Sequence, residues 1–408
     1  MRPHGGEYPR CCFESAAIRM RIAHLGTFDV DNYGDLLFPL VAQWRLPGAS
    51  WVHISPCGGR AEFVDSVNTI RFDEATTESF DAVVVGGGNI VHLRRSSLAQ
   101  YSSLAGMAYP ALSLGATALA RCLNVPLVFN GPSVRKVEMG RIETRLLADI
   151  FSQSSYTALR DEFSVSLADR SGATPARMIP DTAFDISRMW PIESRNEVGR
   201  VVGHVVVHVN RRYGGDAYST AKAIDRICSK SGGNVQFLPI GPCHGDIEYM
   251  REVSAHMSCP SLSSSVLSLR AFAEQIATAQ AYVGSSMHGF ITAISYGVPA
   301  LLVLENRPLE KFGGLLKTLE APAYVICNSW EDAVTRFDRR WTIDSNVRNQ
   351  IFSSLDEHWT DLEAAVGGQG VKKSPATIAH WSTFVKLSQM EVGIRRAVRW
   401  ITKMRSYR

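Results

Sequence analysis

The residues best suited to chemistry follow a short apolar segment in the second half of the chain, in GSSMHG at residues 284–289. The pattern predicts a strand that ends in small hydroxyl side chains, followed by a helix that His288 opens. The first turn of a helix offers unpaired N–H groups and partial positive charge, which suit a phosphate or a carboxylate. Because an imidazole can exchange protons near neutral pH, His288 is a candidate acid–base group, with Ser285, Ser286 and Gly289 as candidate anion-binding residues. A purely structural role as a helix start is the alternative.

Candidate cations follow the first strand expected in the second half, in VVVHVNRR at residues 205–212. Arg211 and Arg212 lie where that strand ends, and guanidinium groups pair bidentately with carboxylate and phosphate oxygens. The placement predicts a cationic site for an anionic ligand, and a solvated surface pair is the alternative. His244 and Glu305 follow other second-half strands and are secondary candidates for acceptor contacts.

The first apolar segment of the chain ends in the loop GTFDVDNYGD at residues 26–35. Gly34 permits a tight turn, and either Asn32 or Asp35 can cap the helix that follows. The functional alternative places the Asn32 amide and the Asp35 carboxylate beside acceptor hydroxyls, with Asp35 acting as a base. The residues alone leave both roles open.

Three glycines and an asparagine, residues 86–89, follow the buried strand expected at DAVVV. Glycines let the backbone approach a ligand closely, and their N–H groups can bind an anion. Gly87, Gly88 and Asn89 are therefore candidates for lining the site, although a tight strand-to-helix turn explains the same residues. The pattern is not GxGxxG, and no acidic residue follows at the spacing of a dinucleotide site, so no dinucleotide cofactor is expected.

The elements that position these residues are short apolar segments separated by segments with helical spacing, which is typical of parallel βα units. We expect an α/β protein with two Rossmann-like domains, 21–190 and 200–345, whose parallel sheets face each other across a cleft. The polar segment 191–199 is the expected linker, residues 1–20 a flexible extension, and residues 346–408 C-terminal helices. Ligands of open parallel sheets bind at the carboxyl ends of the strands, where the candidate residues lie.

Composition sets limits on the function. With 45% hydrophobic and 20% charged residues in 408, the chain has the composition of a globular protein. Its apolar runs are shorter than the roughly 20 residues that span a bilayer, and no signal peptide is visible, so we expect a cytoplasmic protein. The eight cysteines form no CxxC pattern and the histidines no HExxH pattern, so no metal is expected. A net charge of +4 spread over so large a surface gives no reason to expect a nucleic-acid partner.

The C-terminal segment is locally basic, with six Lys or Arg residues and no acid from Arg395 onward. As a helix it is amphipathic, with apolar residues such as Ile394 and Ile401 among the basic ones. Such a helix packs on the first domain or lies on an anionic membrane surface, and packing is the more common outcome.

Taken in their order along the chain, five short segments resemble those of the polysaccharide pyruvyl transferase family, over approximately residues 20–320. The matching pieces are NYGD (32–35), GGG (86–88), RDEFS (160–164), PD (180–181), and SMHG (286–289) followed by GVP (297–299). Many family members carry arginine at the position of Ser286, so Arg211 or Arg212 is expected to supply the missing charge. Arg160 and Asp161 are expected to pair with each other and to hold the surface between the domains.

This resemblance implies a GT-B-like arrangement in which the second half holds the donor. It also implies an enzyme that moves the pyruvyl group of phosphoenolpyruvate onto two hydroxyls of a sugar, in a polysaccharide or its precursor, with release of phosphate. His288 would then be the acid–base group, and no cofactor is expected beyond the donor substrate. If the acceptor were a lipid-linked sugar, contact of the basic C-terminal helix with the cytoplasmic face of the membrane would make sense.

Two other functions are compatible with the same architecture. The first is a GT-B nucleotide-sugar glycosyltransferase, in which Glu305 would contact the ribose. The second is a catalytically inactive glycan-binding protein, in which His288 caps a helix and the arginines are solvated.

Overall fold

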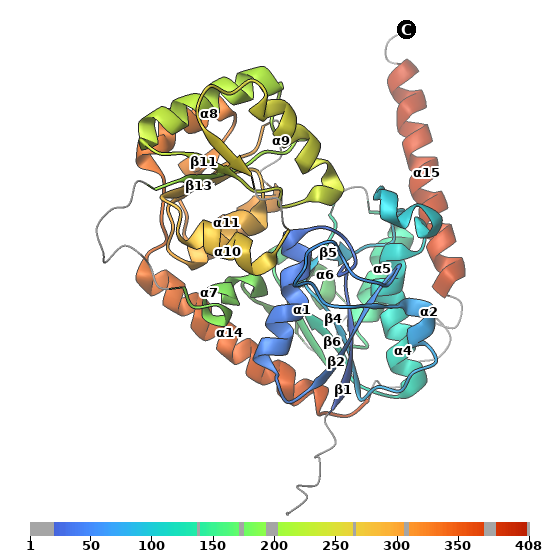
Figure 1. Cartoon of the computed structure of the whole chain (residues 1–408). Coiled ribbons are helices and arrows are strands. Elements are labelled where there is room, and N and C mark those ends of the chain that lie inside the picture. Colours follow the sequence, from blue (N-terminus) through green and yellow to red (C-terminus); the bar gives the residue numbers. More distant parts are fainter. Residues whose placement is uncertain are drawn as a thin grey trace, which may run out of the picture.

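The computed structural model describes residues 20–136, 139–170, 175–192, 203–263, 267–305, 310–370 and 381–405, which form two halves with a parallel sheet in each (Figure 1). The first sheet has seven strands in the order β3-β2-β1-β4-β6-β8-β9, and every neighbouring pair is parallel. Its strands are β1 (Arg21–Leu25), β2 (Ser50–Ser55), β3 (Ile70–Arg71), β4 (Ala82–Val85), β6 (Leu127–Asn130), β8 (Tyr156–Leu159) and β9 (Arg177–Met178). Both β4 and β6 bury all their residues, as central strands of a parallel sheet do.

The remaining elements of the first half connect and cover these strands. They are α1 (Tyr33–Arg45), α2 (Phe72–Ala75), β5 (Gly88–Val91), η1 (Ala99–Leu104), α3 (Ala108–Pro110), η2 (Ala111–Gly115), α4 (Ala116–Leu123), β7 (Pro132–Val134), α5 (Arg141–Phe151), α6 (Glu162–Asp169), η3 (Thr182–Asp185) and α7 (Ile186–Met189).

The second sheet has six parallel strands in the order β12-β11-β10-β13-β14-β15. They are β10 (Val205–His208), β11 (Val235–Phe237), β12 (Ser261–Ser263), β13 (Ala281–Gly284), β14 (Ala300–Val303) and β15 (Ile326–Cys327). The helical elements of this half are α8 (Ala217–Ser231), η5 (Pro242–His244), α9 (Asp246–Ser254), α10 (Leu269–Ala277), α11 (Met287–Ser295), α12 (Glu310–Thr318), η6 (Ala323–Val325), α13 (Trp330–Arg336) and η7 (Phe337–Arg339). The predicted α/β class with two Rossmann-like halves is confirmed.

The glycine run after β4 differs from the expected strand-to-helix turn. Gly88 has a φ of +95° and begins β5, which pairs in parallel with β7 in a separate two-stranded sheet. The left-handed φ favours glycine at this position and lets the chain leave the main sheet without entering a helix.

The two halves share one hydrophobic core, which includes Tyr33 of α1 and Phe272 of α10. The backbone N–H of Tyr33 donates to the carbonyl of Ile240 at 2.8 Å, and its hydroxyl lies 3.1 Å from Thr292 Oγ1. Asp65 of the first half accepts hydrogen bonds from backbone N–H groups at the start of α10. These contacts fix the second half against α1.

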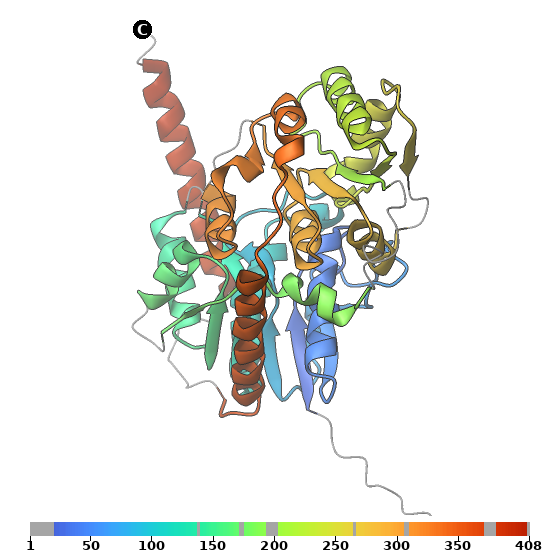
Figure 2. The same cartoon turned by 90° about the vertical axis from the view of Figure 1, so that its left-hand side faces the viewer.

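Helix α14 (Ser345–Val366) returns the chain from the second half to the first (Figure 2). Its His358 is fully buried between Tyr156 and Asn130, with Nδ1 2.9 Å from the Tyr156 hydroxyl and Nε2 2.8 Å from Asn130 Oδ1. Burial lowers the pKa of His358 to about 3, so the neutral imidazole is part of the fold.

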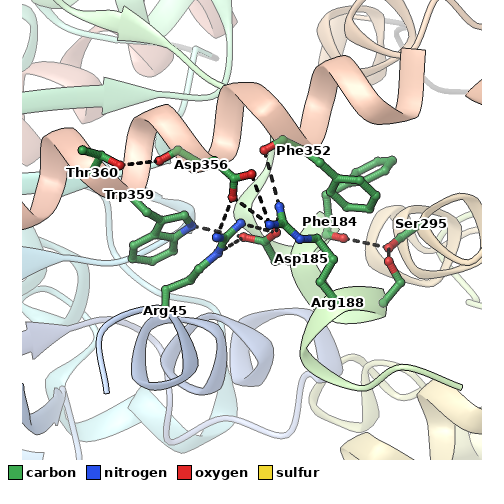
Figure 3. A network of polar contacts seen from close by, with 10 residues as sticks. Arg45, Phe184, Asp185, Arg188, Ser295, Phe352, Asp356, Trp359 and Thr360 are labelled. Atoms are coloured by element: carbon green, nitrogen blue, oxygen red, sulfur yellow. Dashed lines mark hydrogen bonds and ion pairs between the residues drawn. The ribbon is translucent and has the colours of Figure 1, made fainter. Parts of the chain in front are cut away.

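A buried ionic network joins α1, the η3–α7 segment and α14 (Figure 3). Asp185 is completely buried and accepts two hydrogen bonds of 2.7 Å from Arg45, as well as one of 3.1 Å from Trp359. Asp356 of α14 binds the remaining arm of Arg45 at 2.7 Å and Arg188 at 2.8 Å. Because every charge in the network has a partner, the network holds α14 against α1 and α7 of the first half.

Helix α15 (Trp381–Arg405) ends the described chain. Within the described residues no helix combines the length and the apolarity needed to cross a membrane. Apart from Met20, the extension expected at residues 1–20 lies outside the described residues, and so does the expected linker from residue 193 onward.

Candidate functional site

The first turn of α1 and the first turn of α11 meet at His288. A Cβ atom placed on Gly34, in the first turn of α1, would lie only 1.8 Å from His288 Nδ1. The edge-on ring of Phe38 packs against the same imidazole, with 5.5 Å between centroids. Gly34 is not among the glycines with positive φ, so its role is to make room for His288 and not to make the turn that the sequence suggested.

The other side of His288 faces a buried carboxylate. Nε2 lies 3.7 Å from Asp181 Oδ2, and the two side chains are 12% and 4% exposed. Arg160 Nη1 donates to the same oxygen at 2.6 Å, and the N–H of Ala183 donates to Oδ1 at 3.0 Å. Burial alone would raise the pKa of Asp181, but Arg160 and then His288 hold it below its usual range. Asp181 is therefore ionised and can stabilise positive charge that develops on the imidazole.

Arg160 extends these contacts toward the glycine run. Its Nε and Nη2 donate to Ser133 Oγ at 3.2 and 3.1 Å, and that hydroxyl lies 3.4 Å from Asn89 Oδ1. We call the five residues Asn89, Ser133, Arg160, Asp181 and His288 the polar chain. It brings together Asn89, Arg160 and His288, which were predicted separately, and it adds Ser133 and Asp181.

The predicted pairing of Arg160 with Asp161 is wrong. Asp161 caps α6, where it accepts hydrogen bonds from the N–H of Ser164 at 2.9 Å and from its hydroxyl at 2.7 Å. A carboxylate at this position points into the first turn of its own helix, so Arg160 turns to Asp181 instead.

Asp35 lies beside the glycine run, and its Oδ1 would be 3.2 Å from a Cβ on Gly88. A Cβ on Gly87 would lie 2.4 Å from the ring of Phe38, so the run must be glycine to pack against α1. Burial and then the Asp35 carboxylate raise the pKa of Tyr109 to about 12. The helix cap is Asn32, whose Oδ1 accepts from the Gly34 N–H at 3.0 Å, so Asp35 is not needed for capping.

The start of α11 divides its residues between structural and available roles. Ser286 is the helix cap, with its hydroxyl accepting from the Gly289 N–H at 3.2 Å. A Cβ on Gly289 would lie 2.4 Å from the hydroxyl of Tyr282, so this glycine serves close packing. Ser285 is 4% exposed, and its hydroxyl has no hydrogen-bond partner among the described residues. A buried, unpaired hydroxyl beside a helix start suits a ligand oxygen.

Arg211 does not join the polar chain. Its side chain is 59% exposed, pairs with Glu252 of α9 and lies over the ring of Tyr249 at 4.9 Å. The prediction that Arg211 replaces the missing donor-binding cation is therefore not supported, because α9 supplies both a carboxylate and an aromatic face for it. Arg212 is exposed, and its backbone N–H donates to Asn210 Oδ1 at 3.0 Å. Among the described residues its guanidinium has no hydrogen-bond partner, so its role stays a prediction.

The two secondary candidates lie on separate loops of the second half. His244 is exposed at the end of η5. Glu305 lies beside the loop after β10, where a Cβ on Gly215 would be 2.5 Å from its Oε2. Neither touches the polar chain in the contacts described above.

A second buried cluster escaped the sequence reasoning. Asp246 accepts hydrogen bonds from Asn210 Nδ2 at 2.5 Å and from the Gly241 N–H at 2.6 Å, and lies 2.7 Å from His208 Nε2. It thereby ties together the loops that follow β10 and β11. No local pattern announces Asp246, which simply follows a glycine at the start of α9. Among the described residues, no group of three His, Cys, Asp or Glu side chains is arranged to hold a metal ion.

The fold resembles solved sugar-nucleotide enzymes. The UDP-GlcNAc 2-epimerase from Methanocaldococcus jannaschii matches 83% of this chain and 100% of its own, with a TM-score of 0.51 and 12% identity. The S. aureus MnaA–UDP co-structure matches 87% of this chain and 100% of its own, with a TM-score of 0.51 and 10% identity. The UDP-N-acetylglucosamine 2-epimerase from Rickettsia bellii matches 85% of this chain and 98% of its own, with a TM-score of 0.50 and 9% identity. At such identities the similarity concerns the fold alone, and it confirms the GT-B-like arrangement.

Sequence comparison identifies the family. No curated protein matches the chain significantly. A family model described as polysaccharide pyruvyl transferase matches residues 27–307, which is more than half of the chain and includes Gly34, the glycine run, Arg160, Asp181 and His288. The chain therefore belongs to the polysaccharide pyruvyl transferase family.

Proposed function

We propose that the protein transfers the pyruvyl group of phosphoenolpyruvate to two hydroxyls of one sugar, in a polysaccharide or its precursor, to form a pyruvate ketal. Two C–O bonds form at C2 of the donor, and the bond from C2 to the phosphate oxygen breaks. Of the two hydroxyl protons, one is added to the methylene carbon to make the methyl group, and the other leaves with phosphate. The reaction needs a proton donor, a base and a site for two anionic groups.

The residues of the site divide these tasks. His288 delivers the proton to the methylene carbon, and the ionised Asp181 stabilises the imidazolium before transfer. Asp35 of the other half acts as the base toward an acceptor hydroxyl. The unpaired Ser285 hydroxyl and the first N–H groups of α11 bind the donor's charged oxygens. Arg160 holds Asp181 in place from behind.

One observation carries this proposal: the glycine of the NYGD segment and the histidine of the SMHG segment touch, although 254 positions separate Gly34 from His288. The contact joins an acid–base group of the second half to a carboxylate-bearing turn of the first. The His288 side chain is 12% exposed, so the imidazole is only partly accessible from solvent at this contact.

Phosphate release tests the proposal. The purified full chain is incubated with phosphoenolpyruvate and candidate glycans, including lipid-linked sugars, and separately with nucleotide sugars and the same acceptors. The expected result is that phosphate is released from phosphoenolpyruvate only when an acceptor is present, and that nucleotide sugars are not turned over. Turnover of nucleotide sugars would replace the proposal by glycosyl transfer, and turnover of neither donor would favour a glycan-binding protein.

Variants test the assigned roles. His288→Ala should lower kcat by about 10²- to 10⁴-fold, the usual contribution of a general acid. His256→Ala is the matched control, because this exposed histidine lies on the surface near Tyr218 and should leave the rate unchanged. Asp181→Asn should lower kcat and alter its pH profile, since it removes the charge beside His288. Full activity of His288→Ala would remove this residue from the mechanism.

A further inference from the structure

Helix α15 is attached to the first half by one of its faces. Val385 and Ser388 are fully buried there. Gln389 Nε2 donates to the carbonyls of Leu93 and Gly106 at 2.9 and 2.8 Å. Glu391 accepts from the N–H groups of Arg141 and Ile142, both at 3.0 Å, and so caps α5. This face is occupied, and the helix has a fixed orientation on the protein.

The opposite face of α15 carries large apolar side chains that contact nothing in the core. Leu387, Met390 and Ile394 are 44%, 63% and 61% exposed, and their spacing of three and four residues puts them on one stripe. The same spacing continues along the helix at positions 397 and 401. Both views show the C-terminal part of the helix extending beyond the body of the protein (Figures 1 and 2). We call this face the apolar stripe.

The sequence that follows the apolar stripe is strongly basic, and so is a hollow beside α15. The chain from Arg395 onward has six Lys or Arg residues and no acid. Where α15 meets α5 and α6, a hollow of about 530 Å³ is lined by Arg141, Arg145, Arg170 and Arg395, with no acidic residue among its lining. Arg395 pairs with Glu391, whereas the other three form no ion pair with a described residue.

We propose that α15 binds the surface of an anionic lipid bilayer, with the apolar stripe inserted at the level of the headgroups. The alternative occupant is the same helix of a second copy, because the spacing also suits a coiled coil. Charge argues against that, since two copies would bring two basic segments together without a compensating acid. An anionic bilayer supplies both the apolar layer and the opposite charge. This inference does not depend on the proposed reaction.

Vesicle co-sedimentation of the full chain tests the inference. The probes are vesicles of phosphatidylcholine alone and vesicles with about 30% phosphatidylglycerol. Binding to the anionic vesicles only is expected, and it should weaken when salt is raised from about 0.1 M to about 1 M, where screening becomes short-ranged. Equal binding to both vesicles, or binding to neither, would overturn the proposal.

Single substitutions then locate the contact. Met390→Glu and Ile394→Glu should each reduce partitioning by about tenfold or more, because they place a charge within the apolar stripe. Val64→Glu is the matched control, since Val64 is 58% exposed on another surface and gains the same charge. An equal loss in the control would show that net charge alone is responsible and would refute the stripe. Sedimentation analysis that finds a dimer dissolved by Ile394→Glu, without vesicle binding, would assign the face to a second copy.

Discussion

The contact between Gly34 and His288 gives a quantitative prediction. The Cβ of Gly34→Ala would lie 1.8 Å from Nδ1, so the imidazole would have to retreat by about 1.6 Å to reach ordinary van der Waals contact. Overpacking of this kind costs about 1–3 kcal/mol when neighbours cannot move freely. His288 is enclosed by Phe38 and Asp181, so it has little room to move.

The cost can be isolated because alanine is otherwise favourable at this helical position, by about 1 kcal/mol relative to glycine. In a His288→Ala background the clash is absent, and Gly34→Ala should show only that gain. In the wild-type background, the change in the free energy of unfolding caused by Gly34→Ala should therefore be about 1–3 kcal/mol more unfavourable than in the His288→Ala background. Urea unfolding of the four proteins measures this coupling.

The rate provides a second readout. Displacing a catalytic group by more than 1 Å lowers turnover by about a hundredfold. Gly34→Ala should therefore lower the rate of phosphate release by about that factor, although the protein stays folded. Gly48→Ala is the control, because a Cβ there meets nothing within 4 Å. If the effects of Gly34→Ala and His288→Ala on stability add within about 0.5 kcal/mol, the close contact does not exist in solution and the assigned site is wrong.

Two further predictions concern stability. Asp185→Ala should lower the free energy of unfolding, measured by urea titration, by about 3–5 kcal/mol, because the guanidinium of Arg45, which is 12% exposed, loses its buried partner. Asp356→Ala removes a half-exposed carboxylate and should lower the same free energy by about 1 kcal/mol or less. Acid should also destabilise the fold, because burial lowers the pKa of His53 to about 4 and of His92 and His358 to about 3. These neutral histidines contribute their full stability above the pKa of about 6.5 that they have in the unfolded chain, and the contribution is lost as the pH falls. The loss is on the order of 2 kcal/mol for each histidine at about pH 5. Unfolding midpoints in urea that do not change between about pH 7.5 and about pH 5 would contradict this.

The strands that the sequence predicted are those with continuous apolar runs. The segments at β1, β4, β10 and β13 are buried in the centres of the two sheets, where such runs are required. The short β5 and β7 were missed because one contains a glycine with positive φ and the other begins with proline. Residues of those types indicate turns in a one-dimensional pattern, and only the pairing of the two segments makes them strands.

The candidate site could be predicted in part. His288 and Asp35 could be singled out as candidates because both lie where an apolar strand gives way to a helix. The partner of Arg160 was not, because its sequence neighbour Asp161 is engaged in capping α6 and the true partner lies 21 positions away. The surroundings of Arg211 could not be predicted for a related reason, since Glu252, which lies 41 positions away, pairs with its guanidinium on α9.

These outcomes have a common physical origin. A residue at a strand end is brought to the edge of the sheet by its own segment, so its presence near a site follows from local pattern. The group that it touches there depends on which side chains of other segments reach the same point. Gly34 shows the limit most clearly, because its importance comes from an atom that it lacks, and only the approach of His288 from the other half gives that absence a function. A glycine of this kind can be recognised in a sequence as permitting a turn, but it can be assigned to a site only when both halves are placed together.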